Sequence, residues 1–477
     1  MMSKKTINNP SLTLYAFHLR ADAEAEVTPN AAHLWEKFAQ LSEVFSAPQL
    51  RELTDKLICY QKGQYKPQAE PASLYLNLIQ TSPHELRFSL PPQKALNLNA
   101  SVYPLKLHDV YAVDFTLFCE NQTVEINQLH HFNPQGALMP NRIEASLGET
   151  LLFYAEPAGN GVADQSLADE CVRALLQGSQ QSCPSCIDQI LLFGSPLFVY
   201  ETLSPNNAPS PNESTRILVW LGQDEETVSL ATQANPWLIN LLSAYHKIQF
   251  TYFQAAQSNQ SAHQLYKELG KQSQQFSYLS TEQKVRLRQL ESLLSKMPQA
   301  ALNYAKHLRD LEDHRTTIET NAENYGKWLS KIRQFALATD ELTFWETFQQ
   351  QTSLRYQQQI SIYLNYLKSG HQLFGQMIET IRGMVEIEGQ KLQTVFEEKQ
   401  RISDRRLQFL IAFIGVAVGV GAISATVIPN PVESFTWLSD FQFIPTAFVK
   451  VLFHLIVGGG VALILSPFIR MIAKWFD

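Results

Sequence analysis

The sequence has 477 residues, enough for two or three domains, and a formal net charge of −7. An acidic balance gives no support to nucleic-acid binding, which needs a basic surface, so we expect no nucleic-acid partner. Five cysteines are an odd number and argue against a disulfide framework. Hydrophobic residues make up 45% of the chain, so long uncharged runs are local features that need their own explanation.

The sequence pattern of residues 1–230 predicts a cytoplasmic α/β domain. Runs rich in β-branched and aromatic residues alternate with turn-rich breaks, and Ala31–Tyr60 and Asp164–Gln177 have the spacing of helices. The expected strands are residues 11–19, 73–79, 86–90, 110–118, 150–154, 187–193, 197–201 and 216–221. The domain boundary is placed near residue 230, after the last of these strands.

Residues 231–406 predict a bundle of long helices and a stalk. Leucines recur three and four residues apart among charged residues and glutamines, and glycine and proline are rare. Breaks are expected near Met297-Pro298, Ala338–Asp340 and Ser369-Gly370, with the last helix beginning near Gly370. The seam of that last helix reads Ile378, Ile381, Val385, Glu388, Leu392, Val395, Lys399, Ile402 and Arg406, which suits a coiled stalk with polar interruptions.

Residues 407–477 predict a hairpin of two transmembrane helices. The first span, about 407–428, is 22 residues without a charge, and the second covers about 446–469. About 20 apolar residues in a helix cross the hydrocarbon core of a bilayer. Lysines and arginines flank the outer ends of the hairpin, whereas the connecting loop has none. The bias of basic residues toward the inside therefore predicts an inner-membrane protein with both termini in the cytoplasm.

One stripe of the first span consists of small or polar side chains at spacings of three and four. Its members are Gln408, Ala412, Gly415, Gly419, Ala422 and Thr426. Two interpretations remain open: close packing of helices, for which Gly415-xxx-Gly419 is a typical spacing, or the lining of a narrow pore built from several copies of this helix. If the stripe lines a pore, Glu433 and Asp440 of the outer loop could form acidic rings that concentrate cations.

The chain contains no complete signature of an active site or of a resident metal. It lacks a phosphate-binding P-loop, and the HExxH-like stretch at His84 has Phe88 in place of the second histidine. Cys183 and Cys186 have zinc-site spacing but no second pair, and two free thiols in a loop are the simpler interpretation. We therefore expect no enzyme, no catalytic residues, no metal site and no cofactor.

The order of an α/β domain, long helices, a stalk and two C-terminal spans resembles that of the CorA-type magnesium channels. A local stretch is also similar to this family: residues 308–314 (LRDLEDH), followed by residues 318–320 (IET) and Tyr325, match its RD-x-x-DH…IET…Y pattern. The resemblance implies a homo-oligomer, as a pentamer, with one copy of the first span from each subunit around a pore for cations.

The sequence departs from this family at the mouth of the pore. Gly-Met-Asn, which ends the first span in family members and binds hydrated magnesium there, occurs nowhere in the chain. Thr426 and Asn430 stand near the corresponding place without matching the motif, so Asn430 joins the pore-lining candidates by position alone. Relatives without the motif also act as membrane effectors, which implies a small-molecule or nucleotide ligand that gates the pore.

Two functions follow as hypotheses. The first is a homo-oligomeric CorA-like ion channel or ligand-gated pore in the lipid bilayer, with gating controlled by the cytoplasmic domain. The alternative is a membrane-anchored ligand-sensing or scaffold protein without a pore. Symmetry distinguishes them, because a pore needs several copies of the first span around an axis.

Overall fold

The computed structural model describes residues 5–396 apart from 23–25, 93–95, 160, 180, 203–209, 211–213 and 276–277, and four single residues beyond 396. Both expected spans therefore lie almost wholly outside the described residues. In the part of the chain that is described, no helix is both long enough and apolar enough to cross a bilayer. The chain forms two compact units. The first comprises residues 1–22, 27–260 and 308–365, and the second residues 23–26, 261–307 and 366–477.

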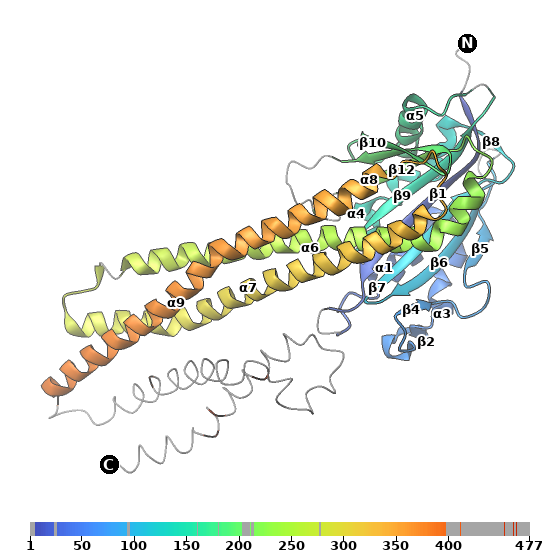
Figure 1. Ribbon diagram of the computed structural model, residues 1–477. Coiled ribbons are helices and arrows are strands. Elements are labelled where there is room, and N and C mark those ends of the chain that lie inside the picture. Colours follow the sequence, from blue (N-terminus) through green and yellow to red (C-terminus); the bar gives the residue numbers. More distant parts are fainter. Residues whose placement is uncertain are drawn as a thin grey trace. The chain divides into compact units, whose positions relative to one another are not determined.

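A large sheet forms the centre of the first unit (Figure 1). Ten of its described strands are β1 (Thr6–Leu19), β4 (Tyr75–Asn77), β5 (Leu86–Ser89), β6 (Asn99–Leu107), β7 (Val110–Phe118), β8 (Thr123–Glu125), β9 (Gly148–Pro157), β10 (Ser185–Leu192), β11 (Ser195–Glu201) and β12 (Arg216–Leu221). Their order is β10-β11-β12-β9-β1-β7-β6-β4, with β5 beside β6 and β8 beside β1. The pairing of β12 with β9 is parallel and the other pairings are antiparallel.

The two faces of the sheet have different partners because side chains alternate along each strand. On β1, Leu12 and Leu14 are fully buried in an apolar core that includes Leu34 of helix α1 (His33–Val44). Thr13 and Tyr15 point the other way, where Tyr15 meets the helix α6 (Thr227–Gln275). One face of the sheet therefore packs in a largely apolar core, and the other carries polar side chains beneath a helix.

The core face is completed by short elements that connect the strands. They are α2 (Pro48–Arg51), α3 (Leu53–Lys56), β2 (Tyr60–Gln61), β3 (Gln64–Tyr65), η1 (Pro67–Ala69), η2 (Ile126–His131), η3 (Pro134–Gly136), α4 (Pro140–Ile143) and α5 (Gln165–Leu175). Helix α5 begins where Asp164 accepts a hydrogen bond from the Leu167 amide at 2.9 Å, a typical N-cap. Its apolar stripe, with Cys171 and Leu175 fully buried, faces the core.

Helical segments also pack together within the first unit. They belong to α6, α7 (Gln283–Arg333), α8 (Thr343–Thr347), the π-helical turn η5 (Phe348–Thr352) and α9 (Ser353–Phe396). On α7, Leu311, Ile318 and Tyr325 recur every seven residues and are buried, the spacing of a coiled-coil seam. The rings of Tyr252 on α6 and Tyr356 on α9 stack with centroids 3.9 Å apart.

The turn between β10 and β11 connects the sheet to the loop before α8. Phe193 and Gly194 occupy this turn with positive φ angles of 51° and 73°, a conformation that suits glycine but not phenylalanine. The Asp340 carboxylate accepts hydrogen bonds from both turn amides, at 2.7 and 2.9 Å, and from the Leu337 amide at 2.8 Å. Asp340 therefore fixes the turn between β10 and β11, and it also fixes the loop between α7 and α8 against this turn.

The second unit contains residues 261–275 of α6, residues 283–307 of α7 and residues 366–396 of α9. The Tyr304 hydroxyl donates to the Leu367 carbonyl at 2.7 Å, and Gly370 packs so tightly against Tyr304 and Tyr266 that an added Cβ would lie 2.8 Å from the Tyr266 ring. Glu388, a polar member of the expected seam, pairs with Arg286 of α7 at 2.6 Å. A charge on a buried seam is thus accommodated by a partner on the neighbouring helix.

Most expected elements of the first unit are present. Strands β7 and β12 have the predicted bounds, and the predicted break at Ala338–Asp340 falls between α7 and α8. The breaks near Met297-Pro298 and Ser369-Gly370 are wrong, because α7 and α9 continue through them, and the last helix begins at Ser353 rather than near Gly370. Strand β6 was not predicted.

Candidate functional site

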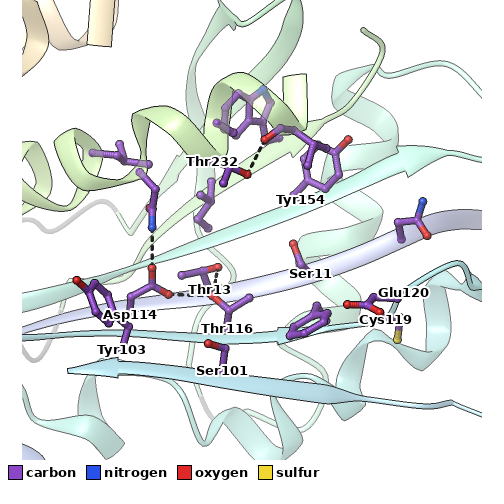
Figure 2. A pocket seen from close by; sticks show the side chains of 18 of the residues that line it. Ser11, Thr13, Ser101, Tyr103, Asp114, Thr116, Cys119, Glu120, Tyr154 and Thr232 are labelled. Carbon is purple, nitrogen blue, oxygen red and sulfur yellow. Dashed lines mark hydrogen bonds between the residues drawn. The ribbon is translucent and has the colours of Figure 1, made fainter. Parts of the chain in front are cut away.

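A cavity of about 650 Å³ lies between the polar face of the sheet and the first turns of α6. Strands β1, β5, β6, β7, β9 and β12 contribute side chains to its lining, and its opposite wall includes Val228, Thr232 and Asn235 of α6. Figure 2 shows Thr13, Thr116 and Ser101 side by side on neighbouring strands, with Ser11 further along β1 and Thr232 on the helix opposite them. The strands bring these residues together because every second position faces the helix.

A hydrogen-bond network centred on Asp114 connects the sheet to α6. Asn235 donates through Nδ2 to Asp114 Oδ2 at 3.0 Å, and its Oδ1 accepts a hydrogen bond from the Tyr15 hydroxyl at 2.6 Å. Thr116 donates to Asp114 Oδ1 at 2.9 Å, and Thr13 lies 2.8 Å from Thr116. Both carboxylate oxygens therefore accept hydrogen bonds, so Asp114 is a fixed acceptor at one end of the cavity.

Three further carboxylates line the cavity. Glu85 accepts from the Ser101 hydroxyl at 2.7 Å and pairs with Arg87 at 2.8 Å. Glu156 accepts from Asn9 at 3.3 Å and from Tyr154 at 3.2 Å, both neutral donors. Glu120 is exposed at the end opposite Asp114 (Figure 2). Against these four acids, Arg87 is the one basic side chain among the described residues of the lining.

Burial changes the pKa values of several groups around the cavity. It raises the pKa of Asp114, with repulsion from Glu85 adding to the effect and the hydrogen bonds from Asn235 and Thr116 opposing it. Burial also raises the pKa of the hydroxyls of Tyr15, Tyr103 and Tyr154. These phenols are therefore neutral near pH 7 and can donate hydrogen bonds.

Further contacts fix α6 on the sheet on either side of the network. At the start of the helix, Thr227 donates to the Phe193 carbonyl at 2.8 Å and lies 2.7 Å from the Ser195 hydroxyl. Three turns beyond Asn235, His246 lies 2.8 Å from Thr150, and Lys247 pairs with Asp109 at 2.5 Å. Burial and the nearby Arg216 lower the pKa of His246 to about 3, so this imidazole is neutral in the fold.

A second cavity, of about 250 Å³, lies beside the Lys247–Asp109 ion pair. Its lining includes His108, Asn324 and Trp328. The Trp328 ring stacks on Trp237 with centroids 5.8 Å apart. Its only charged groups in the described residues of the lining, Lys247 and Asp109, neutralise each other, which makes it a weaker candidate for a binding site than the larger cavity.

The site residues predicted from the sequence are not among the residues that line the larger cavity. The pore-lining candidates Gln408, Ala412, Gly415, Gly419, Ala422, Thr426 and Asn430, and the acidic candidates Glu433 and Asp440, lie outside the described residues. The stretch used for the family resemblance lies on α7, where Arg309 pairs with Asp310 at 3.1 Å and Asp313 at 3.9 Å. Its three residues Leu311, Ile318 and Tyr325 are packing residues.

The other motifs singled out in the sequence form no metal site in the described residues, where no group of three or more potential ligands was found. The five cysteines are free, with Cys183 exposed and Cys186 half-buried. In the HExxH-like stretch, His84 lies 2.8 Å from the Ile79 carbonyl and Glu85 belongs to the cavity.

Sequence reasoning missed the cavity, although one signal for it exists. Polar residues recur at every second position within otherwise apolar strands, as Thr13 and Tyr15 on β1 and Asp114 and Thr116 on β7. Such alternation indicates a polar face in a strand. The sequence does not reveal which helix covers that face.

No protein-family model, curated protein or solved structure matches this chain. None of the comparisons therefore identifies a CorA-like family.

Proposed function

We propose that this chain is one subunit of a homo-oligomeric ion channel in the inner membrane, whose N-terminal sheet domain binds a small ligand that controls the pore. The observation that carries the ligand-binding part of this proposal is the 650 Å³ cavity between the sheet and α6. Its volume lies in the range that suits small-molecule ligands. The uncharged runs 407–428 and 451–469 support the membrane part of the proposal.

The ligand would act by favouring one arrangement of α6 on the sheet. A ligand in the cavity touches strands on one side and Thr232 and Asn235 on the other. It shifts a conformational equilibrium only if it binds one state more tightly than the other. Because α6 is one wall of the cavity, any displacement of the helix changes the site, which gives the ligand this differential affinity.

The pore would be built from the first span of each subunit, with both termini in the cytoplasm. The stripe from Gln408 to Thr426 would line it, and Glu433 and Asp440 would attract cations at its outer mouth. The order of domains, which resembles that of CorA-type channels, supports a pentamer. Permeation needs a wetted path and a gate, so this proposal contains no catalytic residue.

The first test is the mass of the particle in lipid nanodiscs, corrected for bound lipid. Five subunits of 54.1 kDa give 270.5 kDa. Cation flux into liposomes then tests the stripe with Gly415→Leu and Gly419→Leu, which should block conduction or disrupt assembly because the bulky side chain fills the axis or the helix contact. Val418→Leu, off the stripe, is the matched control. Wild-type mass and flux in both glycine variants would remove the stripe from the argument.

The second candidate is a membrane-anchored sensor without a pore. The cavity favours it equally, because ligand binding by the first unit requires no channel. A monomeric or dimeric particle would leave too few first spans to enclose a pore, and the sensor would then become the working hypothesis.

A further inference from the structure

We infer that the cavity between the sheet and α6 binds an elongated organic cation carrying more than one ammonium group. This inference rests on the ligand-binding half of the proposed function and names the class of ligand. It is argued from the charge, shape and hydrogen-bonding groups of the cavity, and it does not require a pore.

The charge of the lining is the first argument. Glu85, Asp114, Glu120 and Glu156 carry four formal negative charges, and Arg87 carries one positive charge among the described residues of the lining. The guanidinium of Arg87 is already paired with Glu85, and two-thirds of its side chain is exposed. A cation is therefore attracted to the cavity, and this field is stronger in a site that the protein partly shields from water.

The same inventory disfavours a phosphate-bearing ligand. Phosphates are bound by arginine, lysine or free backbone amides at a helix N-terminus, and at the start of α6 the amides of Glu226 and Thr227 already donate to Asp224. The described lining contains no lysine or histidine, and the carboxylates of Glu120 and Glu156 have no cationic partner among its described residues. A nucleotide would place its phosphates against these carboxylates. The expectation of a nucleotide ligand is thus not favoured for this cavity.

The arrangement of the acids suggests the shape of the ligand. Asp114 lies in the middle of β7, whereas Glu120 lies two residues beyond the end of that strand. They stand at opposite ends of the row of polar side chains in Figure 2. A cavity of about 650 Å³ is far larger than a single metal ion, and the described residues form no metal-binding group. An extended molecule with separated positive charges meets both ends.

Neutral groups between the acids complete the match. Tyr103, Tyr154 and Trp220 line the cavity, and aromatic faces attract ammonium groups. An ammonium group has three donors and no acceptor, which suits a lining rich in oxygen acceptors.

The test is binding of putrescine and spermidine to the full chain in nanodiscs of uncharged phosphatidylcholine, measured by isothermal titration calorimetry. AMP and ATP are the anionic comparison. Glu120→Gln and Glu156→Gln each remove one charge with little change of shape, and each should weaken spermidine binding about tenfold, or about 1.4 kcal/mol. The matched control is Glu52→Gln, an exposed carboxylate outside the cavity lining, which should leave binding unchanged.

Three results would overturn the inference. These are no binding of either amine at millimolar concentration, binding of AMP or ATP in preference to the amines, and amine affinity that is equal in wild type, Glu120→Gln and Glu156→Gln. The last result would mean general attraction to a chain of net charge −7. Failure of the channel proposal gives a different pattern: spermidine binds and responds to the cavity variants, but the particle is too small for a pore or conducts no ions.

Discussion

Asn235 joins α6 to the sheet, and its replacement by alanine tests whether the Asp114 network holds this helix in place. Asn235→Ala removes two hydrogen bonds, one from Tyr15 at 2.6 Å and one to Asp114 at 3.0 Å. Both partners are buried, with 3% and 9% of their surface exposed. The substitution therefore leaves a buried hydroxyl donor and a buried carboxylate oxygen each without one partner.

The magnitude follows from these two losses. A buried polar group without its partner costs about 1–3 kcal/mol, and Asp114 keeps the hydrogen bond from Thr116. Water that enters the cavity replaces part of the loss, and alanine favours a helix over asparagine by about 0.6 kcal/mol. We expect a net destabilisation of about 2–3 kcal/mol. For a unit of about 300 residues, this corresponds to a decrease in Tm of about 4 °C.

The assay is thermal unfolding of the full chain, followed by tryptophan fluorescence. Asn240→Ala is the matched control, because Asn240 lies on the same helix and its side chain donates to the carbonyl of Pro236 in that helix, at 2.7 Å. It has the same gain in helix propensity, and we expect it to change the stability by less than about 0.5 kcal/mol. Equal Tm values for the two variants would refute the role of the network.

Three other predictions concern groups outside the cavity. Asp340→Ala removes an acceptor for three backbone amides and should destabilise the protein by about 2–4 kcal/mol in urea unfolding, whereas Asp340→Asn should restore part of the loss. His246 has a pKa of about 3 in the fold and about 6.5 in the unfolded chain, so between these pH values it binds a proton only on unfolding, and the stability of the fold decreases as pH falls. In urea unfolding, the stability advantage of wild type over His246→Gln should therefore shrink by about 2 kcal/mol from pH 7 to pH 5. A difference that does not change with pH would contradict this. Among the thiols, the exposed Cys183 should react with a maleimide at pH 8. Cys59 and Cys171 should react only after unfolding, because burial raises the pKa of both thiols to about 12. Mass spectrometry of labelled peptides checks this order.

Strand prediction succeeded where local pattern and tertiary environment agree. Apart from Asp114 in β7 and Arg216 at the start of β12, both segments are runs of apolar and β-branched residues between turns. Strand β6 was missed because Pro104 lies within it, and proline usually argues against a strand interior. In the structure, the Pro104 carbonyl accepts from Leu78 on the side away from β7. The missing amide therefore lies on that side too and removes no hydrogen bond to β7.

The wrong helix breaks have a similar cause. Pro298 removes one hydrogen bond from α7, but the fully buried Met297 and Tyr304 on either side continue the packed stripe. Tertiary packing thus outweighs a local penalty of about 3 kcal/mol. Gly370 is not a helix end but a place of close approach, because its missing side chain makes room for Tyr266 and Tyr304. A glycine of either kind looks the same in one sequence.

The cavity shows why a binding site is harder to predict than the strands that form it. Asp114 by itself indicates only a polar position on a strand, and Asn235 only a polar position on a helix. They lie 121 residues apart in the sequence, and only the packing of α6 on the sheet brings them together. The acidic residues of the site come from separate segments of the sequence, so the negative charge of the cavity is evident only in the folded structure.

Because the cavity and the docking of α6 share Asp114 and Asn235, binding of the proposed ligand would be linked energetically to helix docking. A ligand that binds only the folded first unit stabilises it by about 2.7 kcal/mol at a concentration of 100 times its Kd. This is as large as the expected effect of Asn235→Ala. A cation that pairs with Asp114 would also replace the hydrogen bond that the variant lacks, so saturating spermidine should restore the Tm of Asn235→Ala toward that of ligand-free wild type. Restoration that is equal for an amine and for ATP would mean that the charge of the cavity has no part in this linkage.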